Sequence, residues 1–404
     1  MAKADMDGLP PIKVVGVGGG GCNAINRMVE ARIGGVDFVG VNTDAQALGR
    51  CDANDRIRIG ERITKGLGAG SDPDKGRAAA EESREELKDI LQDAEMVFIT
   101  AGMGGGTGTG AAPVVASLAK ELDALTVAVV TKPFGFEGPR RMRIAEDGLK
   151  KLASTVDTVI TIPNDRLLTL VPRGTSFFEA FKVADDLLRQ AVQGITDIIV
   201  TPGLINRDFA DIKATMAGMG YAMMGTAIAN GENAAVEAAR QAISCPLLED
   251  TRISGSRGVL INIIGSSHLG LHEVNEACSI IRQAAECDEV QINFGVILNE
   301  AMADAVKITV IATGFQPESM RSAAETGPAR QMVEPVVFQH VQPRMPEPAP
   351  PPPIETLPVM EPEAALPFDP EPEPAMVAAE PEPMLDLEDL DTPAYLRQNG
   401  QMVQ

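Results

Sequence analysis

The glycine run at positions 104–110 constrains the fold of this chain more than any other stretch. It reads Gly-Gly-Gly-Thr-Gly-Thr-Gly and stands between an apolar run at 96–100 and an Ala-rich segment at 111–120. Strand, glycine loop and helix in that order can hold an anion, because backbone N–H groups converge where no Cβ intervenes and the helix N-terminus is partly positive. A flexible linker is the alternative, but linkers do not stand between a buried strand and a helix. The run therefore predicts a loop that binds nucleotide phosphate.

The rest of the first 200 residues alternates short apolar runs with helical patterns. Apolar runs lie at 12–17, 36–41, 96–100, 125–131 and 158–162, and helix-like stretches lie at 76–91, 113–122 and 140–152. This alternation predicts an α/β fold with a Rossmann-like parallel sheet, covered on both faces, over residues 12–175. In such sheets, ligands bind at the carboxyl ends of the strands, where the glycine loops fall.

A longer helical pattern with one apolar face spans 176–200, and we expect it to be a long central helix. Residues 201–316 follow, with helical stretches first and β-like runs at 258–264, 289–298 and 306–312. We predict a second α/β domain there, joined to the first through the central helix. Residues 1–11 are predicted to be a flexible N-terminus.

The composition changes sharply near residue 317. From there on, the chain holds 19 of its 29 prolines, with 16 acidic and only 4 basic residues, including four consecutive prolines at 350–353. Such a segment cannot bury enough apolar surface to fold. We therefore predict a disordered tail, in which 317–383 is a Pro/Glu-rich linker and 384–404 is a terminal peptide.

Charge and cysteine content exclude several classes of protein. The net charge of −22, the absence of Trp and the absence of a basic patch argue against nucleic-acid binding. No apolar run approaches the length of a membrane span, and the N-terminus lacks a signal-peptide pattern, so we expect no membrane insertion and a cytoplasmic location. The five cysteines have no metal-binding spacing and are expected to be buried thiols: Cys22, Cys51, Cys245, Cys278 and Cys287.

A second glycine motif, Gly16-x-Gly18-x-x-Gly21, follows the first apolar run. Alone it is typical of dinucleotide binding, with Asp37 or Asp44 as the ribose acid, so an NAD-dependent oxidoreductase is one alternative. Two glycine loops, however, suit the longer phosphate chain of a nucleoside triphosphate. The three histidines, His268, His272 and His340, also offer no obvious acid–base pair. No P-loop sequence is present.

Six blocks of sequence resemble the tubulin-like GTPases and, within them, the FtsZ family. They are GVGGGGCNAINRM (16–28), VNTDAQAL (41–48), AGMGGGTGTGAAP (101–113), KPFGFEGPRR (132–141), TIPNDRLL (161–168) and PGLINRDFADIKATM (202–216). The resemblance runs in order over about residues 11–315. It implies a GTPase that uses GTP, GDP and Mg²⁺ and assembles head to tail into the bacterial division ring, at midcell on the inner face of the cytoplasmic membrane.

The resemblance also implies a set of nucleotide contacts. Phosphate contacts are expected from Gly19, Gly20, Gly21, Cys22, Asn23, Asn42, Gly70, Gly104, Gly105, Gly106, Thr107, Gly108 and Thr109. Glu137 and Arg141 are expected at the ribose, Asn164 and Asp185 at the guanine, and Phe181 stacked on the base. A carboxylate at Asp185 could accept from both N1–H and the exocyclic amine of guanine, although a solvated helix face is its alternative role. Mg²⁺ is expected to be held mainly by the phosphates, near Asp44, and Ser71-Asp72 departs from the commonest family pattern.

Asp208 and Asp211 lie three residues apart at the start of a predicted helix, so both carboxylates can share one face. Helix capping is the simplest role for the pair. The resemblance instead implies that these carboxylates, with Asn206, enter the nucleotide pocket of the next subunit and polarise the attacking water. Hydrolysis would then require assembly. A filament that binds GTP without turnover is the alternative, and the paired carboxylates argue against it.

The terminal peptide places several apolar residues among acids: Leu385, Leu387, Leu390, Tyr395 and Leu396. Its stretch DTPAYLR (391–397) resembles the C-terminal peptide of the family. The resemblance implies docking of membrane-anchoring and regulatory division proteins on residues 384–404, where composition alone would favour a solvated tail.

Overall fold

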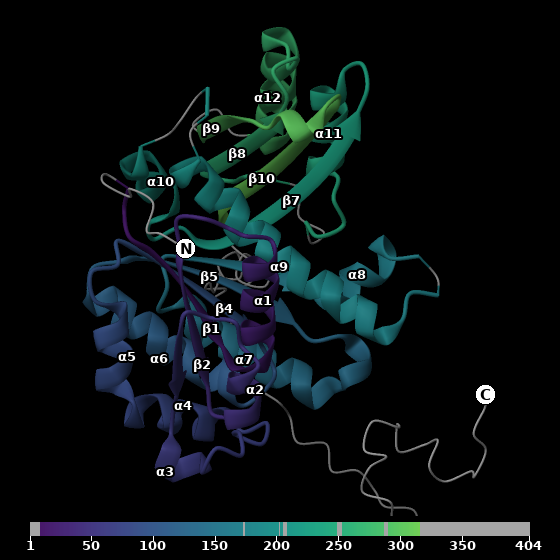
Figure 1. The fold of residues 1–404 in the computed structure, drawn as a ribbon. Coiled ribbons are helices and arrows are strands. Elements are labelled where there is room, and N and C mark those ends of the chain that lie inside the picture. The colour runs from purple at the N-terminus through teal and green to yellow at the C-terminus, as the bar shows by residue number, and fades with distance from the viewer. Residues whose placement is uncertain are drawn as a thin grey trace, which may run out of the picture. The chain divides into compact units, whose positions relative to one another are not determined.

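The computed structural model describes residues 9–172, 174–201, 203–204, 208–248, 253–286 and 290–315. Asn206, the linker 317–383, the terminal peptide 384–404 and most of the N-terminal segment 1–11 lie outside these described residues. The described strands form one ten-stranded sheet, in the order β3-β2-β1-β4-β5-β6-β7-β10-β8-β9 (Figure 1). The α/β class and the parallel sheet predicted from the sequence are confirmed.

The first six strands are parallel throughout: β1 Ile12–Val17, β2 Asp37–Asn42, β3 Asp55–Arg58, β4 Met96–Gly102, β5 Leu125–Lys132 and β6 Thr158–Pro163. Alternate residues of each strand enter different cores, so that Val14 packs on one face of the sheet and Val15 on the other. Burial on both faces accounts for the continuous apolar runs of these strands, where a half-exposed strand would alternate.

The helices of this half divide between the two faces of the sheet. Helix α1 (Gly18–Glu30) and the central helix α9 (Phe177–Val200) contribute apolar residues to one core. Four helices supply the other core: α4 (Pro73–Glu82), α5 (Arg84–Leu91), α6 (Thr107–Glu121) and α7 (Pro139–Ala153). Three shorter helices connect the strands: α2 (Ala45–Gly49), α3 (Glu61–Thr64) and α8 (Asn164–Leu170). No helix of the described part is both long enough and apolar enough to cross a membrane.

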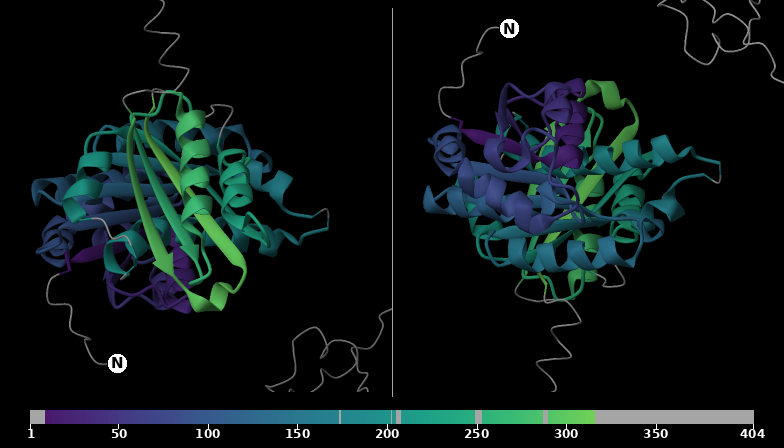
Figure 2. Two further views of the ribbon diagram at one scale, coloured as in Figure 1. Left: turned by 90° about the horizontal axis from the view of Figure 1, so that it is seen from above. Right: turned by 90° about the horizontal axis from the view of Figure 1, so that it is seen from below.

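The second half adds helix α10 (Phe209–Met216) and four strands: β7 Gly220–Asn230, β8 Gly258–Gly265, β9 Gln291–Leu298 and β10 Ala305–Phe315. Strand β10 is antiparallel to both β7 and β8, and β8 is parallel to β9. Helices α11 (Ala234–Ile243) and α12 (Leu271–Ala285) share a core with these strands (Figure 2). The central helix also contacts β8 and β9 of the second half.

Three features of the fold differ from the expectations drawn from the sequence. Strand β7 directly follows α10, so the second half does not begin with helices alone; the run of Gly, Ala and Met at 220–230 hides the strand because it contains few β-branched residues. The two halves are also joined by strand pairing, since β6 and β7 are parallel partners over Thr158–Ile160. In addition, the helix predicted at 76–91 is two helices that meet at Ser83.

Candidate nucleotide site

Two glycine loops meet at the carboxyl edge of the parallel sheet. Helix α1 begins at Gly18, directly after β1, and α6 begins at Thr107, shortly after the neighbouring strand β4. A Cβ atom placed on Gly18 would lie 3.0 Å from the backbone nitrogen of Gly108, which shows how closely the loops approach. Both helix N-termini therefore offer unpaired backbone N–H groups and partial positive charge at one place, which is an arrangement that binds anions.

A cavity of about 690 Å³ opens in front of these loops. Its volume lies in the range of small-molecule sites. Twelve of the predicted nucleotide contacts line it: Gly19, Gly20, Asn23, Gly105, Gly106, Thr107, Gly108, Glu137, Arg141, Asn164, Phe181 and Asp185. A Cβ atom on Gly19 or on Gly105 would meet no protein atom within 4 Å, so a side chain at either position would project into open space. The shape of this cradle fits a phosphate chain.

Asn164 and Asp185 are polar lining residues of the cavity that a ligand can engage. Asn164 is only 4% exposed, and its Oδ1 atom has no hydrogen-bond partner among the described residues, so a ligand donor can fill that role. Burial raises the pKa of Asp185 to about 7, and the positive charge of Arg27 opposes the rise. A ligand that donates hydrogen bonds to Asp185 would stabilise its carboxylate form.

Aromatic rings surround Phe181 beside these polar groups. Its ring centroid lies 4.9 Å from that of Phe177 and 5.2 Å from that of Phe134. Phe177 remains 67% exposed although it lines the cavity. This cluster offers an apolar face on which a planar base can stack.

Glu137 and Arg141 form an ion pair with an N–O distance of 3.1 Å between η1 (Gly135–Glu137) and α7. Glu137 also accepts a hydrogen bond of 2.8 Å from the backbone N–H of Phe134, which fixes its position. Gly104 makes room for the pair, since a Cβ atom there would lie 2.8 Å from Cγ of Arg141. The predicted ribose contacts are therefore held in place before a ligand arrives.

Six predicted contacts do not line the cavity: Gly21, Cys22, Asn42, Gly70, Gly104 and Thr109. Gly21, Gly104 and Thr109 shape the loops from within the protein. A Cβ atom on Gly21 would lie 2.4 Å from the carbonyl oxygen of Thr100, so this glycine permits close packing of α1 on the sheet. Thr109 accepts a 2.8 Å hydrogen bond from the N–H of Gly104 and sets the bend of the second loop.

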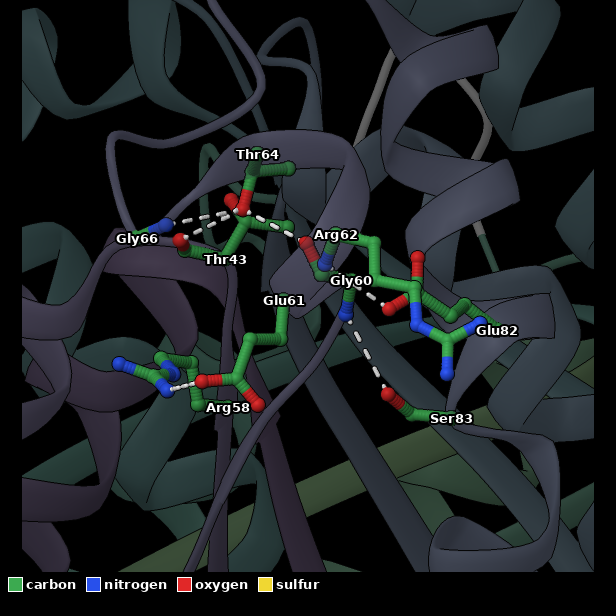
Figure 3. A network of polar contacts seen from close by, with 9 residues as sticks. All are labelled: Thr43, Arg58, Gly60, Glu61, Arg62, Thr64, Gly66, Glu82 and Ser83. Atoms are coloured by element: carbon green, nitrogen blue, oxygen red, sulfur yellow. Dashed lines mark hydrogen bonds and ion pairs between the residues drawn. The ribbon is translucent and has the colours of Figure 1, made fainter.

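Thr43 links the second glycine loop to the segment around α3. Its hydroxyl lies 2.6 Å from the hydroxyl of Thr107, and its carbonyl accepts from the hydroxyl of Thr64 at 3.2 Å. Figure 3 shows how α3 is in turn held by the break between α4 and α5, where Ser83 accepts from the N–H of Gly60 at 3.2 Å. The break between α4 and α5 at Ser83, which the sequence patterns did not indicate, thus supports the second glycine loop through α3 and Thr43.

One carboxylate oxygen of Asp44 is engaged in capping a helix. Its Oδ1 atom accepts from the backbone N–H groups of Gln46 at 2.8 Å and Ala47 at 3.0 Å, and so caps α2. Within the described ranges, no three His, Cys, Asp or Glu side chains gather into a metal site.

Asp208 and Asp211 lie at the N-terminus of α10, outside the cavity lining. Asp208 is the N-cap residue, with its Oδ1 atom 3.5 Å from the backbone nitrogen of Ala210, so it does cap this helix. The acidic residues that do line the cavity belong to neither glycine loop: Glu30, Asp52, Glu137 and Asp185. The chain therefore presents a nucleotide cradle and, separately, a pair of carboxylates.

Several lining residues escaped the sequence analysis. Asn26, Arg27 and Glu30 follow Asn23 at helical spacing, so they continue its face of α1 along the cavity wall. Phe177, Phe178 and Lys182 extend the face of α9 that carries Phe181 and Asp185 in the same way. Helical periodicity shows only that each group shares one face of its helix; the packing of α1 beside α9 brings both faces to the cavity.

Comparisons with known proteins agree with this geometry. The model of the Tubulin/FtsZ family GTPase domain matches residues 11–172, and the model of the FtsZ family C-terminal domain matches residues 220–316. An empty FtsZ dimer structure from M. jannaschii is 42% identical with a TM-score of 0.73, and the match covers 83% of this chain and 96% of that one. A mutant FtsZ of M. jannaschii is 45% identical with a TM-score of 0.73, over 77% of this chain and 92% of that one.

CetZ2 from Haloferax volcanii, in a GTPγS-bound protofilament, shares the fold with a TM-score of 0.67 at 24% identity, over 78% of this chain and 99% of that chain. The identity to the M. jannaschii structures extends over both halves and the central helix, and both family models match in the expected order. The chain belongs to the tubulin/FtsZ family, as an FtsZ-type protein, and it is a GTPase.

Proposed function

We propose that this protein polymerises head to tail into filaments that form the bacterial cell-division ring, and that it hydrolyses GTP at each junction between subunits. It would do so in the cytoplasm, at midcell, on the inner face of the cytoplasmic membrane. Self-association is described for relatives, as an FtsZ dimer from M. jannaschii and as a CetZ2 protofilament from Haloferax volcanii.

The observation that carries the proposal is the separation of the carboxylate pair from the nucleotide cradle. A group that polarises a water must be within hydrogen-bonding reach of it, and neither Asp208 nor Asp211 lines the cavity of its own chain. A second copy can supply both when its α10 faces the cradle of the first. Such a contact joins two different surfaces, so it repeats along an open filament rather than closing a dimer.

The cradle supports the remaining roles. The N–H groups at the starts of α1 and α6 would hold the phosphates, and Asn164 and Asp185 would select guanine by accepting its N–H groups. Mg²⁺ would arrive with the triphosphate and neutralise its charge, while Asn206 would help to order the segment that carries Asp208 and Asp211. Hydrolysis then requires mainly the positioning of one water against a neutralised phosphate.

Turnover as a function of protein concentration tests the shared site. Phosphate release per molecule should rise steeply above a threshold concentration, and polymer should sediment with GTP but much less with GDP. A specific activity that stays constant down to strongly dilute protein would show that one chain holds a complete site.

The terminal peptide 384–404 is proposed to dock membrane-anchoring and regulatory division proteins, with 317–383 as the spacer. A flexible chain of this length reaches on the order of 40–50 Å. Deleting 384–404 should leave GTP hydrolysis intact and abolish recruitment to the division site. Scrambling 317–383 at fixed composition is the matched control and should preserve both properties. Unaided localisation of the truncated protein would contradict the docking role.

A further inference from the structure

Two cysteines lie against each other behind the first glycine loop. Cys22 belongs to the first turns of α1, and Cys51 follows α2 in a segment without regular structure. Their side chains are 2% and 1% exposed, and the Sγ atom of Cys51 lies 4.0 Å from the carbonyl oxygen of Cys22. The two thiols lie close enough for each to shift the pKa of the other, and both are free. Neither thiol lines the nucleotide cavity.

The two thiols differ in acidity. The hydrogen bond from Cys22, a backbone N–H of Ala53 and the charge of Arg56 lower the pKa of Cys51 to about 7, against the effects of burial and of Asp52. The same hydrogen bond and burial raise the pKa of Cys22 above its usual value. The lowered pKa favours the thiolate form of Cys51 and the raised pKa favours the thiol form of Cys22, and oxidants convert such a combination to a disulfide.

One side chain of α1 is hydrogen-bonded to both residues that flank Cys51. Asn26 donates from Nδ2 to the carbonyl of Arg50 at 2.9 Å and accepts at Oδ1 from the N–H of Asp52 at 2.8 Å. These two hydrogen bonds hold the segment 50–52 over Cys51. Their loss would open an irregular segment with exposed flanks, which is a small local event compared with unfolding. Asn26 and Asp52 both line the nucleotide cavity, so the clamp and the ligand share residues.

We propose that Cys22 and Cys51 form a reversible disulfide that weakens nucleotide binding. With hydrogen peroxide as the oxidant, the Cys51 thiolate attacks one peroxide oxygen and the O–O bond breaks. The hydroxide that leaves takes up the proton that Cys51 released on ionising, so a sulfenic acid and water result. The sulfur of Cys22 then attacks the sulfur of Cys51, the S–O bond breaks, and the hydroxyl leaves as a second water with the proton of Cys22. Two thiols and one peroxide thus give one disulfide and two waters, and a dithiol reductant reverses the change.

The effect of the disulfide on nucleotide binding depends on which of the two cysteine-bearing segments can move. The turn that carries Cys22 is fixed, because Gly21 packs so closely on the carbonyl of Thr100 that a Cβ atom would lie 2.4 Å away. The irregular segment 50–52 must therefore approach α1 when the sulfurs bond. Because Arg50 and Asp52 are hydrogen-bonded to Asn26, that movement distorts both hydrogen bonds and shifts Asp52 and Asn26 in the cavity wall. By reciprocity, bound nucleotide disfavours the oxidation by the same coupling.

The test uses the full chain with Cys245, Cys278 and Cys287 replaced by Ala, so that only the pair remains. The protein is stripped of nucleotide, treated with hydrogen peroxide, alkylated and digested without reduction. Mass spectrometry should find the peptides of Cys22 and Cys51 joined, with the loss of two hydrogen atoms. The oxidised protein should bind GDP about tenfold more weakly than the reduced protein, and reduction should restore the affinity. The same background with Cys51→Ala should show neither change.

Absence of the 22–51 cross-link in nucleotide-free protein would overturn the proposal, and so would a cross-linked protein with unchanged GDP affinity. The effect on affinity rests on the nucleotide role of the cavity, whereas the cross-link itself does not. GTP hydrolysis by the reduced protein is measured alongside, so a failure of the proposed function is distinguished from a failure of the thiol pair.

Discussion

Gly19 and Gly21 lie two residues apart in the same loop, yet the structure predicts opposite effects when each is replaced by Ala. A Cβ atom on Gly19 would meet no protein atom within 4 Å and would project into the cavity, whereas one on Gly21 would lie 2.4 Å from the carbonyl of Thr100. Gly19→Ala should therefore impair nucleotide binding alone. Gly21→Ala should impair the folding of the loop itself.

The magnitudes follow from these contacts. Gly19 lies in the first turn of α1 with an ordinary backbone conformation, so Ala there should raise the free energy of unfolding by up to about 1 kcal/mol or leave it unchanged. The added methyl group overpacks the phosphate cradle once nucleotide is bound. Overpacking by about 1–3 kcal/mol corresponds to a roughly 5- to 150-fold loss of affinity. For Gly21→Ala, a similar 1–3 kcal/mol or more should be lost from the stability of the nucleotide-free protein.

Two measurements on each variant separate these effects. Urea unfolding without nucleotide gives the free energy of unfolding, and equilibrium titration with labelled GDP gives the affinity. The reasoning is refuted if Gly19→Ala binds GDP as tightly as the parent protein. It is equally refuted if Gly19→Ala is as unstable as Gly21→Ala, because both glycines would then serve packing alone.

Three further substitutions test other parts of the site. Asn164→Ala should weaken GTP binding by about 1–3 kcal/mol. The stability of the nucleotide-free protein should stay nearly unchanged, because Oδ1 of Asn164 has no described partner to lose. A large drop in the urea midpoint would show that Asn164 is structural. Asp185 has a pKa of about 7 in the folded protein against 3.8 for the free side chain, so between these pH values the folded state binds more protons and stability falls as pH rises. Asp185→Asn should remove this loss of stability with rising pH, and it should also remove the affinity for guanine. If the parent protein and Asp185→Asn showed the same dependence of urea unfolding on pH from 4 to 8, the raised pKa of Asp185 would be contradicted. Asp211→Ala should bind GTP normally and hydrolyse it poorly. The control Lys213→Ala, on the same helix, should impair neither binding nor hydrolysis. Loss of GTP binding by the Asp211→Ala monomer would place Asp211 in the pocket of its own chain.

The parallel sheet and the phosphate loops could be predicted because their signals are local. Buried parallel strands read as apolar runs, and a glycine run between a strand and a helix is typical of an anion-binding loop. Even there, α6 begins at Thr107 rather than beyond 110, since glycines have low helix propensity and hide the first turn. Strand β7 was missed for a related reason, because Gly, Ala and Met in 220–230 carry little β signal and the pairing with β10 determines the structure.

The lining of the site was predictable only in part. The residues of the glycine loops that line the cavity are set largely by the loop pattern, and most of them were among the predicted contacts. Arg27 and Lys182 line the cavity because two helices lie side by side, which no local pattern contains. Conversely, Gly21 and Thr109 share the glycine-loop pattern but act within the protein, and only the packing distances separate such residues from those that face the ligand.

Mixing two inactive variants tests the central claim most directly. Asp211→Ala retains its nucleotide cradle, and Thr107→Arg blocks its own cradle but keeps the carboxylates of α10. If each site is assembled from two chains, the mixture should release phosphate well above the sum of the separate variants, because one chain supplies the cradle and the other the carboxylates. A chain that carries both substitutions, mixed with Asp211→Ala, is the matched control and should give no gain. A mixture no more active than its components would contradict the shared site.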